Sequence, residues 1–196
     1  MEQGINFFDH ADIYGKGGSE SLFASAVGMT PSLREEMVLQ TKCAIHDGMY
    51  DFSKKHILQS VDGSLKRLQT DYIDVLLLHR PDTLMEPEEV AEAFAALRQS
   101  GKVHYFGVSN QNAAQMALLQ SALGEKLIVN QLQFSLAHTG IIDAGVHVNM
   151  KDEAGIMRDG GILEYCRLNG ITIQAWSPLQ YGFFGGIFLD SPAYPE

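Results

Sequence analysis

With 196 residues, of which 14 are Lys or Arg and 24 are Asp or Glu, the chain has a formal net charge of −10. Neither nucleic acid nor an anionic membrane surface is therefore an expected partner. The length and the 45% hydrophobic content suit one domain over residues 1–196 with a single core. The first residues show no leader pattern and the longest aliphatic run, residues 75–78, is too short to span a bilayer, which predicts a cytoplasmic protein.

The cysteine and histidine content indicates neither a disulfide framework nor a metal site. Only Cys43 and Cys166 are present, and they do not form a CxxC motif. The histidines do not cluster at the spacing of metal ligands. We therefore expect two reduced thiols and no bound metal.

The first half of the chain alternates strand-like and helix-like segments. Three short apolar runs each stop at a polar residue, as buried strands do. After the glycine-rich turn 15–18, apolar residues recur at helical spacing until the helix breaker Pro31. A second stretch of helical spacing begins after Ser53, a favourable N-cap. The predicted strands are residues 5–8, 37–41 and 72–78, and the predicted helices are residues 19–27 and 54–68.

The second half continues the alternation. A helix is predicted from Pro87 to the residues before Gly101, with Pro87 at its first position and acidic residues in its first turn. Residues 135–161 are too polar and glycine-rich for one element, so we expect a loop over one face of the fold. The other predicted helices are residues 113–123 and 162–168, and the predicted strands are residues 103–108, 126–130 and 171–175.

Strands that alternate with helices and are apolar along their whole length predict a parallel sheet covered by helices. Two architectures fit, a closed barrel and an open doubly wound sheet. An open sheet gathers its site at one switch point, usually beside a GxGxxG turn, whereas a barrel takes residues from many strand ends. Here GxGxxG is absent and every strand ends in a polar or aromatic residue. This pattern favours a (β/α)8 barrel, incomplete here with about six βα units.

Polar residues at three strand ends suggest one site. Asp9, Lys42 and His79 end successive predicted strands at the same edge, and Tyr14 follows just beyond Asp9. An unpaired buried carboxylate is costly, so we expect Lys42 to pair with Asp9. The ammonium would also favour the anion of a neighbouring phenol and lower its pKa, which would make Tyr14 a general acid. His79 could hydrogen-bond the oxygen of a bound carbonyl.

The site lacks a protein nucleophile, since no Ser or Cys stands beside a base in a recognisable elbow. A hydride from a reduced nicotinamide would complete the chemistry. Ser109, Asn110 and Gln131 end two further strands and offer donors and acceptors for a carboxamide. Trp176 offers a flat face for an aromatic ring, and Ser177 and the nearby backbone are available for a pyrophosphate.

Six segments, in order, resemble the aldo-keto reductase family: NFFDHADIYG, LQTKC, LLLHRPD, YFGVSN, VNQLQFS and AWSPL. The resemblance covers most of residues 4–182 and points to the bacterial, cytoplasmic branch. It implies reduction of aldehyde or ketone carbonyls with NADPH. The implied catalytic tetrad is Asp9, Tyr14, Lys42 and His79, with Tyr14 as the proton donor. The implied cofactor contacts are Ser109, Asn110 and Gln131 at the nicotinamide amide, Trp176 on the ring, and Ser177 and Leu179 along the pyrophosphate.

The chain departs from the family pattern in length. Such barrels run to about 250 residues, and the resemblance implies that the first and last strands are absent here. NADPH rather than NADH rests on the resemblance alone, because the family holds the 2′-phosphate in the missing final part. Two open strand edges would allow self-association. A catalytically silent fragment or a regulatory nucleotide-binding module is the alternative function, and a glycosidase using Asp9 and Asp12 is a third.

Overall fold

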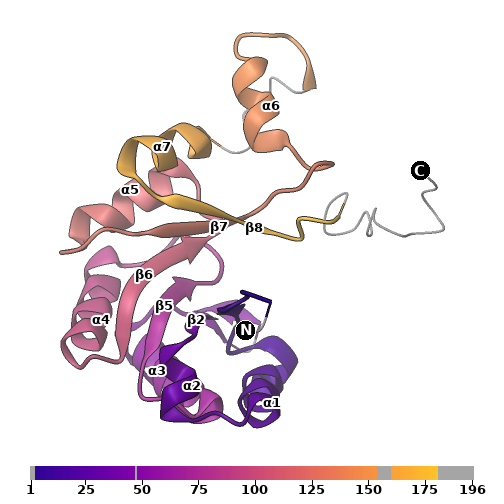
Figure 1. Ribbon diagram of the computed structural model, residues 1–196. Helices are drawn as coiled ribbons and strands as arrows, with labels where there is room; N and C mark the ends of the chain where they lie inside the picture. The colour runs from indigo at the N-terminus through magenta and orange to yellow at the C-terminus, as the bar shows by residue number, and fades with distance from the viewer. Residues whose placement is uncertain (1–2, 47, 154–159, 181–196) are drawn as a thin grey trace.

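Six parallel strands form one curved sheet in the computed structural model, which describes residues 3–46, 48–153 and 160–180 (Figure 1). The strands stand in sequential order, β1-β2-β5-β6-β7-β8. Sequential order is that of a (β/α)8 barrel, because a doubly wound sheet reverses direction at its switch point. The strands are β1 (Phe7–Asp9), β2 (Val38–Cys43), β5 (Ile73–Leu78), β6 (Val103–Ser109), β7 (Val129–Gln133) and β8 (Thr172–Trp176).

The helices between the strands pack side by side on the convex face of the sheet, each against the next in the order α1, α3, α4, α5 and α7 (Figure 1). A short 3-10 helix, η1, precedes α1. Among the described residues, no helix is both long and apolar enough to cross a membrane. The helices are η1 (Tyr14–Gly17), α1 (Gly18–Val27), α2 (Pro31–Glu35), α3 (Lys54–Leu68), α4 (Pro87–Gln99), α5 (Ala113–Ala122), α6 (Gly140–Val146) and α7 (Ile162–Asn169).

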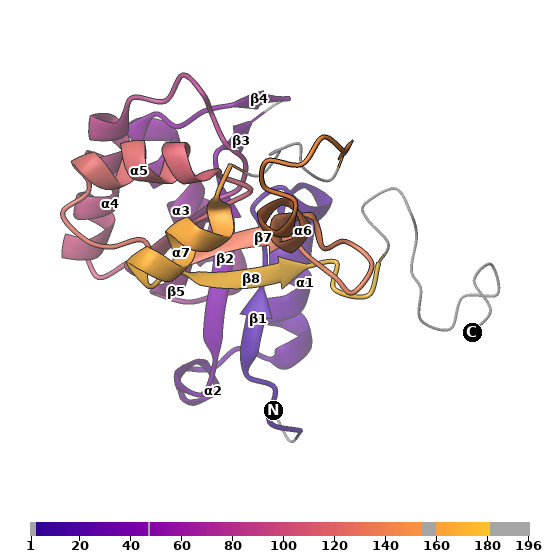
Figure 2. The same cartoon turned by 90° about the horizontal axis from the view of Figure 1, so that it is seen from above.

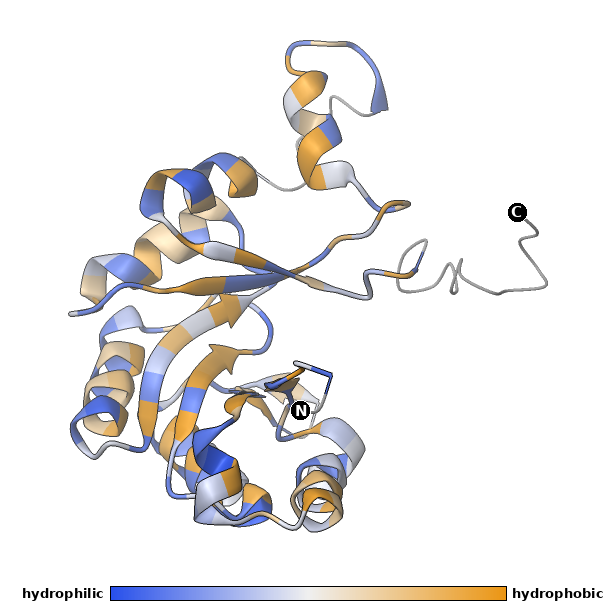
Figure 3. Cartoon of the chain, in the orientation of Figure 1, coloured by the Kyte–Doolittle hydropathy of each residue, from blue (hydrophilic) through white to orange (hydrophobic). Residues whose placement is uncertain are grey.

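The main core lies between the sheet and these helices, and Figure 3 shows the strands and the helix faces that supply it in orange. The rings of Phe94 on α4 and Phe106 on β6 stack there at 4.1 Å between centroids. Successive strand residues alternate between the two faces of the sheet. Leu76 and Leu78 therefore join this core, whereas Leu77 belongs to a small apolar cluster on the other, inner face.

Several predicted boundaries need correction. The first helix ends at Val27 as predicted, but the left-handed backbone of Gly28 (φ 62°) closes it, and Pro31 instead begins α2 behind the N-cap Thr30. The fifth strand starts at Val129 rather than at residue 126 and runs to Gln133. The predicted loop 135–161 contains helix α6. Residues 154–159 of that loop, and 181–196 of the tail, lie outside the described residues.

A small antiparallel hairpin, β3 (Ile45–His46) with β4 (Met49–Tyr50), was not predicted. It follows β2 directly, and Figure 2 shows it beyond the end of that strand. Ala44 makes the turn into it with φ 83°, a left-handed conformation that costs a non-glycine residue energy. The hairpin therefore stands at the same edge of the sheet as the predicted site residues.

The sheet is open between β1 and β8, which each pair with one neighbour among the described residues. Side chains nevertheless cross the opening. Gln40 on β2 donates to Oε1 of Gln174 on β8 at 2.8 Å, and Gln174 donates back to Oε1 of Gln40 at 3.1 Å. These reciprocal bonds hold the two ends of the curved sheet toward each other. Self-association through these two strand edges stays a prediction.

Gly107 on β6 lies where neighbouring strands leave no room for a side chain. A Cβ at this position would lie 2.6 Å from the carbonyl oxygen of Val129 and 2.8 Å from a methyl of Leu77. Replacing Gly107 by alanine should therefore lower the free energy of unfolding by about 1–3 kcal/mol, the usual cost of overpacking a core. Urea denaturation followed by circular dichroism measures this change. The control is Gly124→Ala, where nothing lies within 4 Å, and an equal midpoint for both variants would contradict the prediction.

Candidate active site

The predicted tetrad residues lie together at one edge of the sheet. Asp9 is the last residue of β1, Lys42 is near the end of β2, and His79 directly follows β5. The carboxyl ends of parallel strands share an edge, which is why residues so far apart in the sequence meet. Tyr14 begins η1, just beyond β1, and is 40% exposed.

Lys42 is the centre of this group, with its side chain 1% exposed. Its Nζ donates to Oδ2 of Asp9 at 2.7 Å and to the main-chain oxygen of His10 at 2.8 Å. A third contact of 3.4 Å reaches the hydroxyl oxygen of Tyr14. The expected pairing of Lys42 with Asp9 is therefore present, and one ammonium joins the carboxylate to the phenol.

His79 lies against Tyr14, with the ring centroids 5.6 Å apart and the planes at 79°. Burial lowers the pKa of His79 to about 4, and the positive charges of Lys42 and Arg80 act in the same direction. The imidazole is therefore neutral at physiological pH and has one N–H to donate. Its Nδ1 is buried without a hydrogen-bond partner among the described residues.

Two glutamine amides donate to the Asp9 carboxylate, and a third, Gln174, bonds both of them. Gln40 donates to Oδ1 of Asp9 at 2.7 Å, and Gln131 donates to Oδ2 at 3.2 Å and to Oε1 of Gln174 at 3.3 Å. Gln40 and Gln174 were not predicted as site residues. Period-two alternation could have found them, since each lies two residues before a predicted one, Lys42 and Trp176.

The predicted cofactor residues form a second, connected group. Ser109 donates to the main-chain oxygen of Gln131 at 3.0 Å and accepts from Nδ2 of Asn110 at 2.8 Å. Asn110 has a left-handed backbone (φ 58°), and its Oδ1 accepts from the indole Nε1 of Trp176 at 2.9 Å. The indole ring is thereby fixed to the end of β6, and Arg80 lies 6.0 Å from its centroid.

One cleft of about 500 Å³ joins the two groups. This volume is within the range of small-molecule sites, roughly 300–1,000 Å³. A second cleft of about 580 Å³ adjoins it at the opening of the sheet and shares Asp9, Gln131, Trp176 and Ser177. Leu179, in contrast, is 49% exposed and does not line either cleft. The first cleft is lined by Asp9, Ile13, Tyr14, Ile45, His79, Arg80, Ser109, Asn110, Gln131, Trp176 and Ser177.

His10 lies in the loop after β1, and its side chain is buried there: it is 7% exposed and its ring packs against Phe23, with 4.6 Å between centroids. Burial lowers its pKa below the usual value. Its carbonyl is one of the three acceptors of Lys42, so this residue helps to position the ammonium.

Asp12 is a half-buried carboxylate outside the cleft. Its Oδ1 has no hydrogen-bond partner among the described residues, and burial raises its pKa to about 6. A glycosidase needs two carboxyl groups that flank one sugar. Because Asp9 pairs with Lys42 and Asp12 does not line either cleft, the arrangement does not support that alternative.

Replacing Asp12 by asparagine should change the pH dependence of stability. Because the pKa of Asp12 is raised from 3.8 to about 6 on folding, wild-type stability falls as pH rises through this window. The variant has no such loss, so its free energy of unfolding relative to wild type should increase by about 1 kcal/mol between pH 5 and pH 8. Urea denaturation at both pH values measures the difference. The exposed Asp71→Asn serves as control, and a difference independent of pH would contradict the prediction.

Comparison with known proteins decides the family. The sequence profile of the Aldo/keto reductase family matches residues 1–195. The chain belongs to this family. An uncharacterised oxidoreductase, YcsN, from Bacillus subtilis (strain 168) is 46% identical over 192 residues, covering 93% of this chain and 59% of that protein. A 6-dehydroglucose reductase from Agrobacterium fabrum is 36% identical over 204 residues, covering 99% of this chain and 62% of that protein.

A solved structure agrees with the fold. The aldo/keto reductase from Klebsiella pneumoniae, in complex with NADP and acetate, has a TM-score of 0.72 and 29% identity, over 91% of this chain and 54% of that one. The prediction of a (β/α)8 barrel, incomplete here, is confirmed. The chain spans between half and two thirds of the length of these aldo/keto reductases.

Proposed function

We propose that this chain carries the catalytic face of an NADP(H)-dependent oxidoreductase that reduces aldehydes or ketones to alcohols. One observation carries the proposal. The ammonium of Lys42 contacts both the carboxylate of Asp9 and the hydroxyl of Tyr14, and this group shares a cleft with His79. A phenol bonded to a buried cation is suited to proton transfer, and carbonyl reduction needs a proton at the oxygen.

Tyr14 is the proton donor in this proposal. Its side chain is partly exposed and lines the cleft, so its hydroxyl can reach an oxygen bound there. As the proton leaves, negative charge develops on the phenol oxygen, and the ammonium of Lys42 at 3.4 Å stabilises that charge. Asp9 keeps the ammonium in place through the 2.7 Å ion pair. The ion pair is therefore a positioning device for the phenol.

His79 orients the substrate in this proposal. Its low pKa keeps the ring neutral, so it donates one N–H and does not compete with Tyr14 as an acid. A hydrogen bond from His79 to the carbonyl oxygen would place that oxygen beside the phenol, since the two rings are in edge-to-face contact. Both groups would then act on the same atom, which is the arrangement that favours charge development there.

NADP(H) fits the other wall of the cleft, and when bound it supplies the hydride. Ser109, Asn110 and Gln131 offer amide and hydroxyl groups for its carboxamide, and Trp176 offers a flat indole. Asn110 already bonds Ser109 and Trp176, so it would exchange one of these bonds for the carboxamide. Ser177, with its left-handed backbone (φ 53°), and Leu179 remain our proposed contacts for the pyrophosphate. The Klebsiella relative was solved with NADP.

An absorbance assay tests the proposal. The purified chain is mixed with NADPH and 4-nitrobenzaldehyde, and in a second arm with 6-dehydroglucose, the substrate in the name of the Agrobacterium relative. A steady fall at 340 nm supports reduction. A flat trace in both arms, with a folded protein by circular dichroism, contradicts it.

The alternative is a catalytically silent, nucleotide-binding module, and the open sheet edge favours it. Trp176, the single tryptophan, lines the cleft and can report binding. Quenching of its fluorescence by micromolar NADPH, without turnover, supports the silent module. Quenching together with turnover supports the reductase. The absence of both contradicts NADPH binding, which the reductase and the silent module both require.

A further inference from the structure

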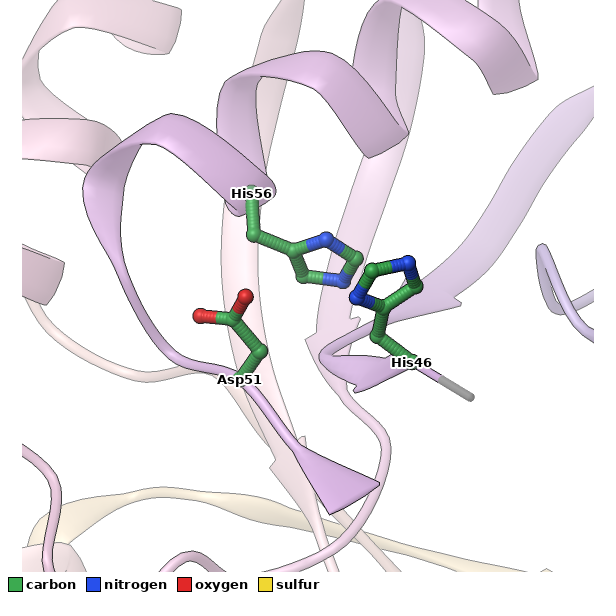
Figure 4. A group of neighbouring side chains, drawn as sticks. All are labelled: His46, Asp51 and His56. Atoms are coloured by element: carbon green, nitrogen blue, oxygen red, sulfur yellow. The ribbon is translucent and has the colours of Figure 1, made fainter. Parts of the chain in front are cut away.

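A second cluster of ligand-bearing side chains lies outside the active-site cleft, at the base of the hairpin. His46 ends β3, Asp51 follows β4, and His56 lies in the first turn of α3. Each offers a ligand atom, and these atoms lie within 4.8 Å of one another. The two imidazole rings stack at 5.0 Å between centroids, with 27° between their planes. Figure 4 shows the two imidazole rings close together, with the carboxylate of Asp51 beside the ring of His56.

We propose that His46, Asp51 and His56 bind one divalent zinc ion. Two imidazole nitrogens and one carboxylate oxygen form a donor set that zinc prefers, and three protein ligands leave a fourth position for water. Tetrahedral zinc holds neighbouring ligand atoms roughly 3.4 Å apart. Side-chain rotations that move the ligand atoms by about 1.5 Å or less bring them to this spacing. The three side chains are exposed or partly exposed, which leaves room for such rotations.

The local electrostatics suit a cation. The carboxylate of Asp51 supplies a negative charge beside the two imidazoles. A neutral imidazole ligates a metal through its unprotonated nitrogen. The N-terminus of α3 carries a partial positive charge that disfavours a cation, and the carboxylate offsets it. The formal net charge of −10 also favours cation binding.

Neighbouring hydrogen bonds already orient two of the ligands. Oδ1 of Asp51 accepts from the backbone N–H of Ser53 at 2.9 Å, which leaves Oδ2 for a metal. Nε2 of His56 lies 3.3 Å from the hydroxyl of Ser60. Partners of this kind fix ligand orientation and raise metal affinity. The three residues are spaced at five-residue intervals across a hairpin and a helix, which matches no zinc motif, so the sequence alone gives no signal for the cluster.

Zinc at this position would connect the hairpin to helix α3. Ile45, the residue before His46, lines the active-site cleft. The ion would therefore hold one wall of that cleft against the helix. Zinc would have this structural role whether or not the chain is a reductase, so a measurement of zinc binding alone tests the site.

Isothermal titration calorimetry of the full chain tests the proposal, with a preparation that carries no histidine tag and was treated with EDTA and then desalted. Zinc chloride should bind at one site with a micromolar dissociation constant, and millimolar magnesium chloride should not compete. His46→Ala, Asp51→Asn and His56→Gln should each weaken zinc binding at least tenfold. The Asp51→Asn variant keeps the side-chain oxygen that accepts from Ser53, so the local turn should be preserved. Weaker zinc binding by this variant would therefore result from loss of the carboxylate charge.

The matched control is His147→Ala. His147 also lies beside a carboxylate, Asp152, at 2.9 Å, but this pair is not part of a three-ligand group among the described residues. Its replacement should leave zinc affinity unchanged. Absence of zinc binding to the wild-type chain, or equal affinity in the cluster variants and the control with all of them folded by circular dichroism, overturns the proposal.

Discussion

Replacing Tyr14 by phenylalanine is expected to lower kcat for aldehyde reduction by about 10²- to 10⁴-fold, the range that a general acid contributes. The variant loses only the hydroxyl that contacts Lys42 at 3.4 Å and keeps the ring against His79. Because Tyr14 begins a partly exposed 3-10 turn, the fold should be unaffected. NADPH affinity, read from quenching of Trp176, should change by less than about twofold, since Tyr14 provides no carboxamide contact in this proposal.

The control for this experiment is Tyr105→Phe. Tyr105 lies on β6, is 49% exposed and does not line either cleft, so its variant should keep the wild-type kcat. Equal rates for Tyr14→Phe and the wild type would exclude Tyr14 as the proton donor. A loss of both turnover and cofactor quenching would instead indicate that the phenol shapes the cleft.

The sequence predicted that Asp9, Lys42 and His79 lie at one edge because parallel strands impose their own geometry. Once residues 5–8, 37–41 and 72–78 are strands of one parallel sheet, the residues that end them must share an edge. The cost of burying an unpaired carboxylate then selects its partner. The Lys42–Asp9 ion pair of 2.7 Å is the result. Neither inference requires knowledge of any long-range contact.

The parts that were missed lack a local signal. Each strand of the β3–β4 hairpin has two residues, too few for period-two alternation to be visible. Helix α6 has no buried residue and no side-chain cap, so neither an apolar stripe nor a capping residue marks it. The bonds between Gln40 and Gln174 depend on how far the sheet curves, which no segment of the sequence encodes alone.

His10 makes a contribution that side-chain patterns do not reveal. It lies in the loop after β1, where its ring packs against Phe23 and its carbonyl oxygen accepts a hydrogen bond from Lys42. The useful group is the main-chain oxygen, and every residue type carries one. Side-chain chemistry therefore gave no warning that this position belongs to the site.

Replacing Lys42 by methionine is expected to lower both stability and activity. Removing one partner of a buried ion pair costs roughly 3–5 kcal/mol. Here the side chain of Asp9 is 35% exposed and keeps its bonds from Gln40 and Gln131, so a loss of about 1–3 kcal/mol is expected. The same change removes the charge that stabilises the phenol oxygen, and kcat should fall by about 10²- to 10³-fold. Urea denaturation and the 340 nm assay measure the two effects.

Two further variants separate these effects. Lys102 forms an exposed ion pair with Asp62, so Lys102→Met should change stability by less than about 1 kcal/mol and leave kcat unaltered. In the double variant Asp9→Asn/Lys42→Met the carboxylate is neutralised, so part of the lost stability should return while kcat stays low. If activity returned together with stability, the ion pair would serve the fold alone. If only stability returned, the folded double variant would still lack the positive charge beside Tyr14. The low kcat would then show that the proposed proton transfer requires the ammonium of Lys42.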